Sequence, residues 1–138
     1  PLGCLNIQPC MAMLYQPRPG NVVMCDYRGF VVPEMDKVRP VVVIARNRRN
    51  RRLVTVVPLS TTEPDSLEDH HHALTNNPLP GREAISCWAK CDMLTTVSLG
   101  RLDRYKIGRG QYAVPTLPVA DFEAIRRAVA KALDLTHI

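Results

Sequence analysis

Three residues that could act on an anionic group lie in or at the ends of the polar segments that flank two apolar segments. Arg39 stands at the start of the apolar run 40–45, Glu34 precedes it by five residues, and Ser60 ends the next apolar segment. A guanidinium offers a rigid fork of donors to phosphate oxygens, a hydroxyl donates one hydrogen bond, and a carboxylate accepts a proton. An ordinary structural role also fits, in which Arg39 caps the loop and pairs with Asp36 or Glu34.

The most basic stretch of the chain is ARNRRNRRL, which places five arginines within residues 46–52. It is flanked by two β-branched apolar segments, each of which predicts a buried strand. Because strands that closely follow one another usually pair as a hairpin, we expect the run to form the turn between them. Asn47 or Asn50 could adopt the positive φ that such a turn often needs. The arginines of this turn either contact nucleic-acid phosphates without regard to base sequence or are simply solvated.

The triplet His70, His71 and His72, followed by Cys87 and Cys91, raises the question of a metal site. The cysteines are separated by three residues, not by the two of a firm zinc signature, and adjacent histidines on a strand point in alternating directions. We therefore expect no metal ligand and no cofactor. Buried core thiols account for the cysteines, and contact with a polyanion or a role as general acid or base would suit one or two histidines.

The hydrophobic patterns predict an α+β domain made mostly of strands. Strands are expected over 21–27, 39–46, 53–60, 70–74, 83–94 and near 105–108, with a loop over 28–37. The C-terminal segment 118–135 repeats apolar residues at helical spacing, namely Val119, Phe122, Ile125, Val129 and Leu133. Short antiparallel strands with one terminal helix indicate a small, strongly bent sheet or an open barrel.

The composition is that of one globular domain. At 138 residues the chain can bury a sizeable core, and we expect a flexible leader over 1–16, its first residues a protease-cleavage remnant, before a single domain over 17–138. A net charge of +5 suits a polyanionic partner. Five cysteines, an odd number, indicate a reducing cytoplasm. No apolar run approaches the roughly 18 residues of a membrane span, and no secretory signal pattern is found.

Four segments, taken in order, carry a specific resemblance. They are PRPGNVVMCDY, KVRPVVVI, VTVVPLSTT and WAKCDMLTTVSLGRLDR, and the terminal helix follows them. In this order they are similar to the MazF/PemK family of toxins from bacterial toxin–antitoxin pairs, over roughly 17–135. The most specific element is the Arg-Pro dipeptide that opens one apolar strand while a hydroxyl residue ends the next. The resemblance implies a CcdB-like, SH3-like open barrel, a homodimer, and metal-independent endoribonuclease activity on single-stranded RNA.

The resemblance assigns catalytic roles to three residues. Arg39 matches the family's catalytic arginine, and we expect it to stabilise the phosphorane and not to transfer protons, because arginine deprotonates only above about pH 12. Ser60 stands at the family's catalytic threonine, and its hydroxyl can donate to a phosphate oxygen or to the leaving oxygen. Glu34 lies where some members carry an acid, which could accept the 2′-OH proton. The products would be a 2′,3′-cyclic phosphate and a 5′-hydroxyl.

Further residues are expected to bind RNA. Asp92 matches the acid of an Arg-x-Asp pair in some relatives, and Lys90 stands in place of the arginine, which keeps the charge but loses the bidentate fork. Trp88 could stack a base, although we favour packing. The other expected RNA contacts are Lys37, Thr61, Arg48, Arg49, Arg51 and His71. An acidic C-terminal segment of the cognate antitoxin would occupy the same basic cleft.

Two other functions fit the same fold. The related CcdB toxins bind DNA gyrase and cut nothing, and a catalytically silent barrel could bind RNA without cleaving it. Arg39 and Ser60 at the matching positions favour the ribonuclease, because a gyrase-binding protein needs neither residue.

Overall fold

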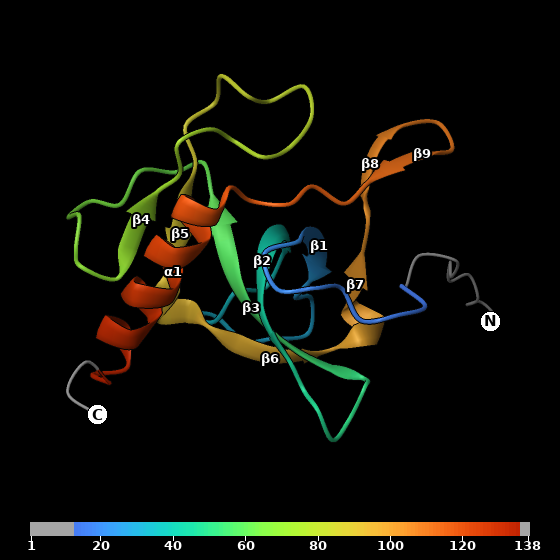
Figure 1. Cartoon of the computed structure of the whole chain (residues 1–138), viewed down its shortest axis with the longest axis horizontal. Helices are drawn as coiled ribbons and strands as arrows, with labels where there is room; N and C mark the ends of the chain where they lie inside the picture. The colour runs from blue at the N-terminus through green and yellow to red at the C-terminus, as the bar shows by residue number, and fades with distance from the viewer. Residues whose placement is uncertain (1–12, 136–138) are drawn as a thin grey trace.

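The computed structural model describes residues 13–135 (Figure 1). Its strands are β1 (Val22–Asp26), β2 (Val38–Arg46), β3 (Leu53–Ser60), β4 (His71–Ala73), β5 (Trp88–Lys90), β6 (Thr95–Ser98), β7 (Leu102–Asp103), β8 (Tyr105–Gly108) and β9 (Gln111–Ala113). Two short 3₁₀ turns, η2 (Cys91–Met93) and η3 (Leu99–Arg101), precede the helix α1 (Val119–Ala132). The expected class, mostly antiparallel strands with one C-terminal helix, is confirmed.

Strand β3 is the centre of the main sheet, whose order is β4-β5-β3-β2-β1-β7. One edge of β3 pairs with β2 along most of its length. The other edge is shared, because its first half pairs with β6 and its last two residues pair with β5. The chain turns at η2 between these two partners, so the sheet bends strongly and stays open. Strands β8 and β9 form a separate hairpin that projects from the sheet (Figure 1).

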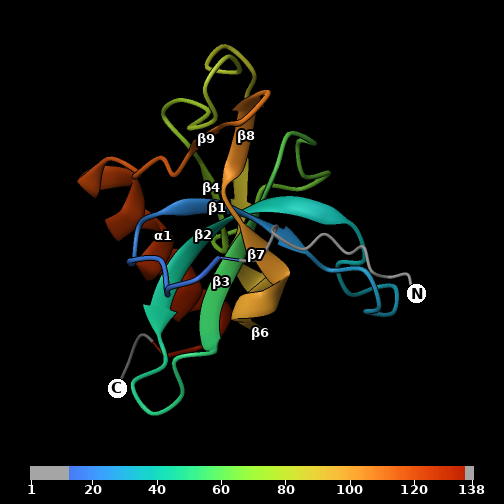
Figure 2. The ribbon, with the colours of Figure 1, turned by 90° about the vertical axis from the view of Figure 1, so that its right-hand side faces the viewer.

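The sheet is buried on both faces, which explains the continuous β-branched runs of β2 and β3. Val42 and Val57 belong to the core cluster under α1, which also contains Ile125 of the helix. Val41 and Val56 alternate with them and belong to a second cluster on the opposite face. Figure 2 shows α1 lying along one side of the sheet. The helix therefore covers one layer of the core and leaves the other to the chain segments around β6 and β7.

Helix α1 packs through the middle of the stripe of apolar residues predicted over 118–135. Ile125 is fully buried, and Phe122 and Val129 pack against the same cluster. The ends of the stripe were predicted wrongly, because Val119 is 78% exposed and Leu133 is 48% exposed. Among residues 13–135, no helix has the length and apolar character needed to cross a bilayer.

A buried carboxylate ties the helix to the edge strand. Asp121 is only 3% exposed, and its Oδ1 lies 2.9 Å from Nε2 of His72. The same oxygen accepts hydrogen bonds from the backbone N–H and the hydroxyl of Thr75, at 3.3 and 3.2 Å. Asp121 therefore fixes α1 against β4 and against the start of the loop that follows it.

We expect Asp121→Ala to lower the free energy of unfolding by about 1–3 kcal/mol, because it leaves His72 and Thr75 without their partner. The loss should appear as a drop of a few degrees in Tm by circular dichroism. Glu123→Ala, on the exposed side of the same helix, is the matched control and should leave Tm within about a degree. An equal Tm for both variants would contradict the role of the buried carboxylate.

The arginine run forms the β2–β3 turn, as expected. Neither asparagine takes positive φ, however, so that part of the prediction was wrong. The side-chain oxygen of Asn47 accepts hydrogen bonds from the backbone N–H groups of Arg49 and Asn50, at 3.0 and 2.8 Å. The side-chain oxygen of Asn50 accepts from the N–H of Arg52 at 2.9 Å. The asparagines thus hold the turn by side-chain caps, and Arg48, Arg49 and Arg51 are exposed on it.

The last residues of the segment expected to be a leader pack against the domain. Met13 is buried, and its N–H donates to the carbonyl of Leu102 at 3.0 Å. Nε2 of Gln16 donates to the carbonyl of Leu53 at 3.0 Å, and Nε of Arg46 donates to the carbonyl of Pro17 at 3.0 Å. Residues 13–17 therefore lie beside the β2–β3 hairpin, and residues 1–12 fall outside the described part of the chain.

The expected strand over 83–94 was the main error in element assignment. Only Trp88–Lys90 is a strand, Cys91–Met93 is a 3₁₀ turn, and Ile85 is 43% exposed in a loop. The predicted burial of Cys87 and Cys91 is nevertheless confirmed. The edge strand expected over 70–74 is present as β4, whereas β6, β7 and β9 were not predicted.

Candidate active site

The β2–β3 hairpin brings Arg39 and Ser60 together. Val41 pairs with Pro58, and the same register continued to the strand ends sets Arg39 across from Ser60. Both residues, together with Thr61, line one cavity of about 210 Å³. Two residues that are 21 positions apart in the sequence therefore face a common space at the end of the sheet.

Three parts of the chain build this cavity. The sheet supplies an apolar surface, the segment between β4 and β5 supplies Asn77 and Arg82, and β8 supplies Tyr105. The apolar lining residues are Met24, Pro40, Leu59, Leu79 and Cys87. These apolar residues lie on the face of the sheet under α1, whereas Arg39 and Ser60 alternate with Pro40 and Leu59 and belong to the opposite face. The cavity that they share therefore lies at the edge where the strands end. Figure 1 shows the loop before β5 and the β8–β9 hairpin rising at this same end of the molecule.

The guanidinium of Arg39 is poised for an anionic ligand. Its Nε is buried and has no hydrogen-bond partner among residues 13–135. A buried donor left unpaired costs roughly 1–3 kcal/mol, so such groups are rare unless a ligand completes them. A phosphate oxygen would satisfy this donor.

Ser60 can act as a hydrogen-bond donor. Its side chain is nearly buried, at 8% exposure, and its Oγ accepts a hydrogen bond from the N–H of Thr62 at 3.0 Å. A hydroxyl has one proton to donate beside its acceptor sites, and the Thr62 contact leaves that proton unused. The site therefore offers a cation and a neutral donor side by side.

Glu34 is not brought into this cavity. It is exposed, its Oε1 accepts a hydrogen bond from the N–H of Val31 at 2.7 Å, and it lines a separate cavity of about 310 Å³ that it shares with Asp92. Lys37 is exposed on the same loop, two residues before Arg39. The two carboxylates predicted from the sequence thus lie together, apart from Arg39 and Ser60.

Several residues expected to bind RNA share one face of the sheet. Ser60 pairs with Trp88, and Lys90 pairs with His71. Because alternate residues of a strand share a face, these four side chains and Arg39 form a row across β2, β3, β5 and β4. At about 4.8 Å per strand, the row spans roughly 14 Å across the sheet. The predicted residues are therefore aligned, although they do not share one cavity.

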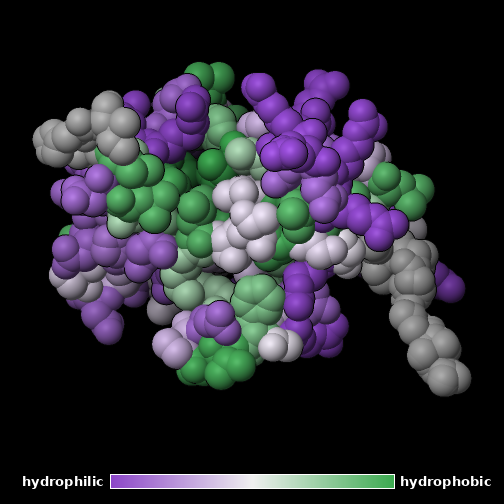
Figure 3. Space-filling view, turned by 90° about the horizontal axis from the view of Figure 1, so that it is seen from below, coloured by the Kyte–Doolittle hydropathy of each residue, from purple (hydrophilic) through white to green (hydrophobic). Residues whose placement is uncertain are grey.

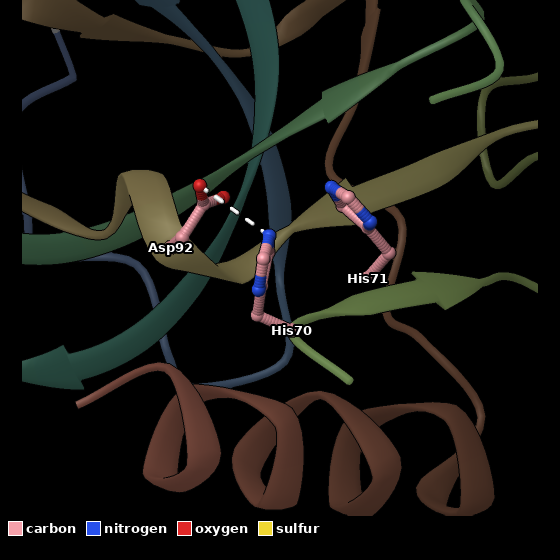
Figure 4. Close-up of side chains that lie close together, drawn as sticks. All are labelled: His70, His71 and Asp92. Atoms are coloured by element: carbon pink, nitrogen blue, oxygen red, sulfur yellow. Dashed lines mark ion pairs between the residues drawn. The ribbon is translucent and has the colours of Figure 1, made fainter. Parts of the chain in front are cut away.

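Two histidines converge at the end of this row (Figure 4). Nε2 of His70 lies 3.5 Å from Oδ2 of Asp92, and the ring centroids of His70 and His71 are 4.2 Å apart. His70 precedes β4, so strand alternation does not separate it from His71 as we had expected. The third histidine, His72, is turned to Asp121 instead.

The ligand atoms of His70, His71 and Asp92 lie within 4.8 Å of one another, close enough to hold a metal ion. Nδ1 of His71, however, accepts a hydrogen bond from the N–H of Glu68 at 3.0 Å. The neutral ring then carries its proton on Nε2, which makes that atom a donor and not a ligand. A metal ion would have to break this contact, whereas an anion near Nε2 would not. The geometry suits contact with phosphate better than metal binding.

The three described cysteines are buried free thiols. Burial raises the pKa of Cys25 and of Cys91 to about 12, and raises the pKa of Cys87 to about 11. Cys87 lines the Arg39–Ser60 cavity, yet a thiol with this pKa stays protonated near neutral pH and is a poor nucleophile. The chemistry of the cavity therefore belongs to Arg39 and the hydroxyls.

We expect the buried thiols to resist labelling by a disulfide reagent at pH 8 in a Cys4→Ser, Cys10→Ser background. Raising the pKa of Cys87 from 9.0 to about 11 lowers its thiolate fraction about 100-fold. Burial of the neutral thiols contributes stability below pH 9, and this contribution is lost as the pH rises towards 11–12. Denaturant should expose all three thiols at once. Rapid labelling of the folded protein would contradict this account.

The turn arginines lie at the other end of the sheet. Residues 39 and 46 are seven steps apart on β2, or about 23 Å. Arg46, Arg51 and Arg52 line a larger cavity of about 770 Å³, beside Leu14 and Tyr15. Arg48 and Arg49 are exposed at the turn. Viewed from below, hydrophilic side chains gather on the side where this turn lies (Figure 3). The turn is thus separate from the Arg39–Ser60 cavity.

Comparison with known proteins identifies the class of fold. An endoribonuclease solved in complex with its cognate antitoxin, from a mycobacterial species, is 23% identical, with a TM-score of 0.63 over 89% of this chain and 100% of that one. MazF of Deinococcus radiodurans is 15% identical, with a TM-score of 0.65 over 87% of this chain and 98% of that one. These similarities establish a MazF-like toxin fold.

Sequence comparison gives the family. The model of the PemK-like, MazF-like toxins of type II toxin–antitoxin systems matches residues 18–133, and the chain belongs to that family. The protein YifN of Escherichia coli (strain K12) is 32% identical over 145 residues, which cover 90% of this chain and 96% of YifN.

Proposed function

We propose that this toxin is a metal-independent, sequence-selective endoribonuclease that cleaves single-stranded mRNA. The observation that carries the proposal is the Arg39–Ser60 pair, in which a half-buried arginine with a buried, unpaired Nε shares one cavity with a hydroxyl that has a free proton to donate. A gyrase-binding role is not favoured, because it would use neither residue.

The proposed reaction is an internal transfer. The 2′-oxygen attacks the adjacent phosphorus, the bond from phosphorus to the 5′-oxygen breaks, and a 2′,3′-cyclic phosphate and a 5′-hydroxyl result. Arg39 stabilises the charge of the phosphorane through its guanidinium. Ser60 donates a hydrogen bond to a phosphate oxygen or to the leaving oxygen. Both groups act on charge that is greatest in the transition state, which is where such donors accelerate a reaction.

Glu34 is the proposed acceptor of the 2′-OH proton. It lines a different cavity from that of Arg39 and Ser60, so the role requires the 28–37 loop to move or the RNA to bend between the two cavities. The loop is clamped at its start by Arg101, whose guanidinium donates to the carbonyls of Asp26 and Arg28 at 2.8 and 3.0 Å. Movement would therefore be limited to the part of the loop beyond Arg28.

RNA is proposed to follow the row from Arg39 to His71. Further contacts are proposed for Lys37, Thr61, Lys90 and Asp92. At the β2–β3 turn, phosphates are proposed to bind Arg48, Arg49 and Arg51. The proposed protein partner is a cognate antitoxin whose acidic C-terminal segment occupies the same basic surface. A homodimer in the bacterial cytoplasm is also proposed.

The test is to incubate the protein, purified under denaturing conditions to remove any antitoxin and then refolded, with a long single-stranded RNA in EDTA. Sequencing of the RNA ends should find cleavage at a short recurring motif with cyclic phosphate ends. RNA that remains intact with the folded wild-type protein would rule out the proposed activity. Cleavage that depends on added metal would rule out the proposed mechanism.

A further inference from the structure

The loop between β4 and β5 is built to hold a fixed shape over the Arg39–Ser60 cavity. Asn77 is 4% exposed, and its Oδ1 accepts a hydrogen bond from the N–H of Leu79 at 3.0 Å, which anchors the loop in the core. The N–H of Arg82 then donates to the carbonyl of Leu79 at 3.0 Å, and the N–H of Ile85 donates to that of Arg82 at 2.9 Å. Two successive turns therefore position Arg82 at the cavity.

The charge of Arg82 is free for a ligand. Its guanidinium has no ion-pair partner among residues 13–135. The neighbouring carboxylate of Glu83 instead accepts a hydrogen bond from the N–H of Gly81 through its Oε2, at 3.2 Å. Arg82 and Arg39 line the same cavity of about 210 Å³, so two guanidinium-bearing residues that no described carboxylate neutralises border one small space. Such an arrangement favours an anion between them.

Tyr105 supplies an aromatic ring to the same cavity. It lies on β8, it is partly exposed, and it also borders a second cavity of about 400 Å³ on its other side. The other tyrosine of this hairpin, Tyr112, already packs against a cation, since the guanidinium of Arg104 lies 4.1 Å from its ring centroid. No such cation covers Tyr105 in the described chain. Its ring packs partly against the core cluster under α1 and borders the two cavities with the rest of its surface, where a planar group can stack on it.

We infer that Arg82 and Tyr105 complete a pocket for one nucleotide beside the Arg39–Ser60 pair. Arg82 binds the phosphate next to the one that is cleaved, and Tyr105 stacks on the base attached to it. The apolar lining of Leu59 and Leu79 excludes water from the stacked base. The β4–β5 loop then helps to determine which RNA sequence is cut. This inference rests on the proposed function, and its test can fail independently of it.

The experiment uses an RNA containing the motif that the wild-type protein cuts, with a 2′-deoxyribose at the cleaved position so that binding is measured without reaction. If no motif is found, a single-stranded oligonucleotide of random sequence replaces it. Tyr105→Ala should raise Kd about 5- to 150-fold, the range for loss of one stacked base. Arg82→Ala should raise Kd about 10-fold and lower the slope of log Kd against log salt by about 0.7.

Matched variants separate this role from a loss of folding. Tyr112→Ala and Arg109→Ala remove one tyrosine and one arginine side chain from the β8–β9 hairpin, outside the cavity, and should leave Kd within about twofold. Tyr105→Phe keeps the ring and should restore binding. With the cleavable RNA, Arg82→Ala should raise KM more than it lowers kcat, and Tyr105→Ala should relax the base preference at one position.

The proposed nucleotide pocket would be overturned if Arg82→Ala and Tyr105→Ala bound RNA with wild-type affinity, or if the matched controls lost as much affinity as they did. RNA that binds to the wild-type protein but is never cut would overturn the endoribonuclease proposal while the binding comparison still tests the pocket.

Discussion

Replacing Arg39 with alanine is expected to reduce the single-turnover rate of RNA cleavage by at least about 10²–10³-fold, the usual cost of removing one preorganised donor to transition-state charge. The reason lies in the buried Nε, which has no partner among residues 13–135 and would be satisfied by a phosphate oxygen. Arg39→Lys should retain charge but not the planar fork, and should recover only part of the rate. Ser60→Ala should cause a smaller loss, because it removes a neutral donor. Each rate is measured in EDTA with the protein in excess over RNA.

The stability of the same variant distinguishes function from structure. An unpaired buried donor costs free energy in the ligand-free protein, so Arg39→Ala should leave Tm unchanged or raise it. Arg28→Ala is the matched control, since Arg28 lies at the other end of the 28–37 loop and its charge is paired with Asp26 at 2.6 Å. It should cleave at close to the wild-type rate. Near wild-type cleavage by Arg39→Ala would remove the basis of the proposed mechanism.

The parts of the fold that could be predicted are those whose contacts are local in sequence. The β2–β3 hairpin follows from two β-branched runs and a polar turn, and α1 follows from the spacing of Phe122, Ile125 and Val129. The error over 83–94 has a physical cause. Cys87, Ala89 and Cys91 alternate into the core as a strand would, but the edge of β3 that they meet is divided between β5 and β6. That division is a long-range contact that no local pattern records.

The candidate site follows the same rule. Arg39 and Ser60 could be paired from the sequence because they terminate the two strands of one hairpin, so their register is set by the turn. Glu34 could not be placed, because the shape of the ten-residue loop depends on the contacts of Arg28 and Phe30 with Arg101, far along the chain. No sequence pattern pointed to Arg82 as a site residue. It lies in an aperiodic loop, and only the anchoring of Asn77 and Leu79 in the core brings it to the cavity.

The turn arginines are expected to set RNA affinity without choosing the cleaved sequence. Replacing Arg48 and Arg49 with glutamine should weaken RNA binding several-fold near 0.1 M salt and lower the slope of log Kd against log salt by about 1.4, or 0.7 for each lost phosphate contact on a single strand. The positions of cleavage should stay the same, because the turn lies about 23 Å along β2 from Arg39 and phosphate contacts carry no base information. Fluorescence anisotropy over a salt series measures the slope, and end sequencing maps the cuts.

The matched control removes the same two charges elsewhere. Arg109→Gln with Arg126→Gln leaves the net charge at +3, as does the turn variant, but places the change on the β8–β9 turn and on the exposed side of α1. If the turn makes direct phosphate contacts, the slope of log Kd against log salt should fall only for the turn variant. A general effect of net charge would lower the slopes of both variants equally. Equal slopes for the two variants would mean that the arginine run is a solvated turn, and that RNA is held by the row from Arg39 to His71 alone.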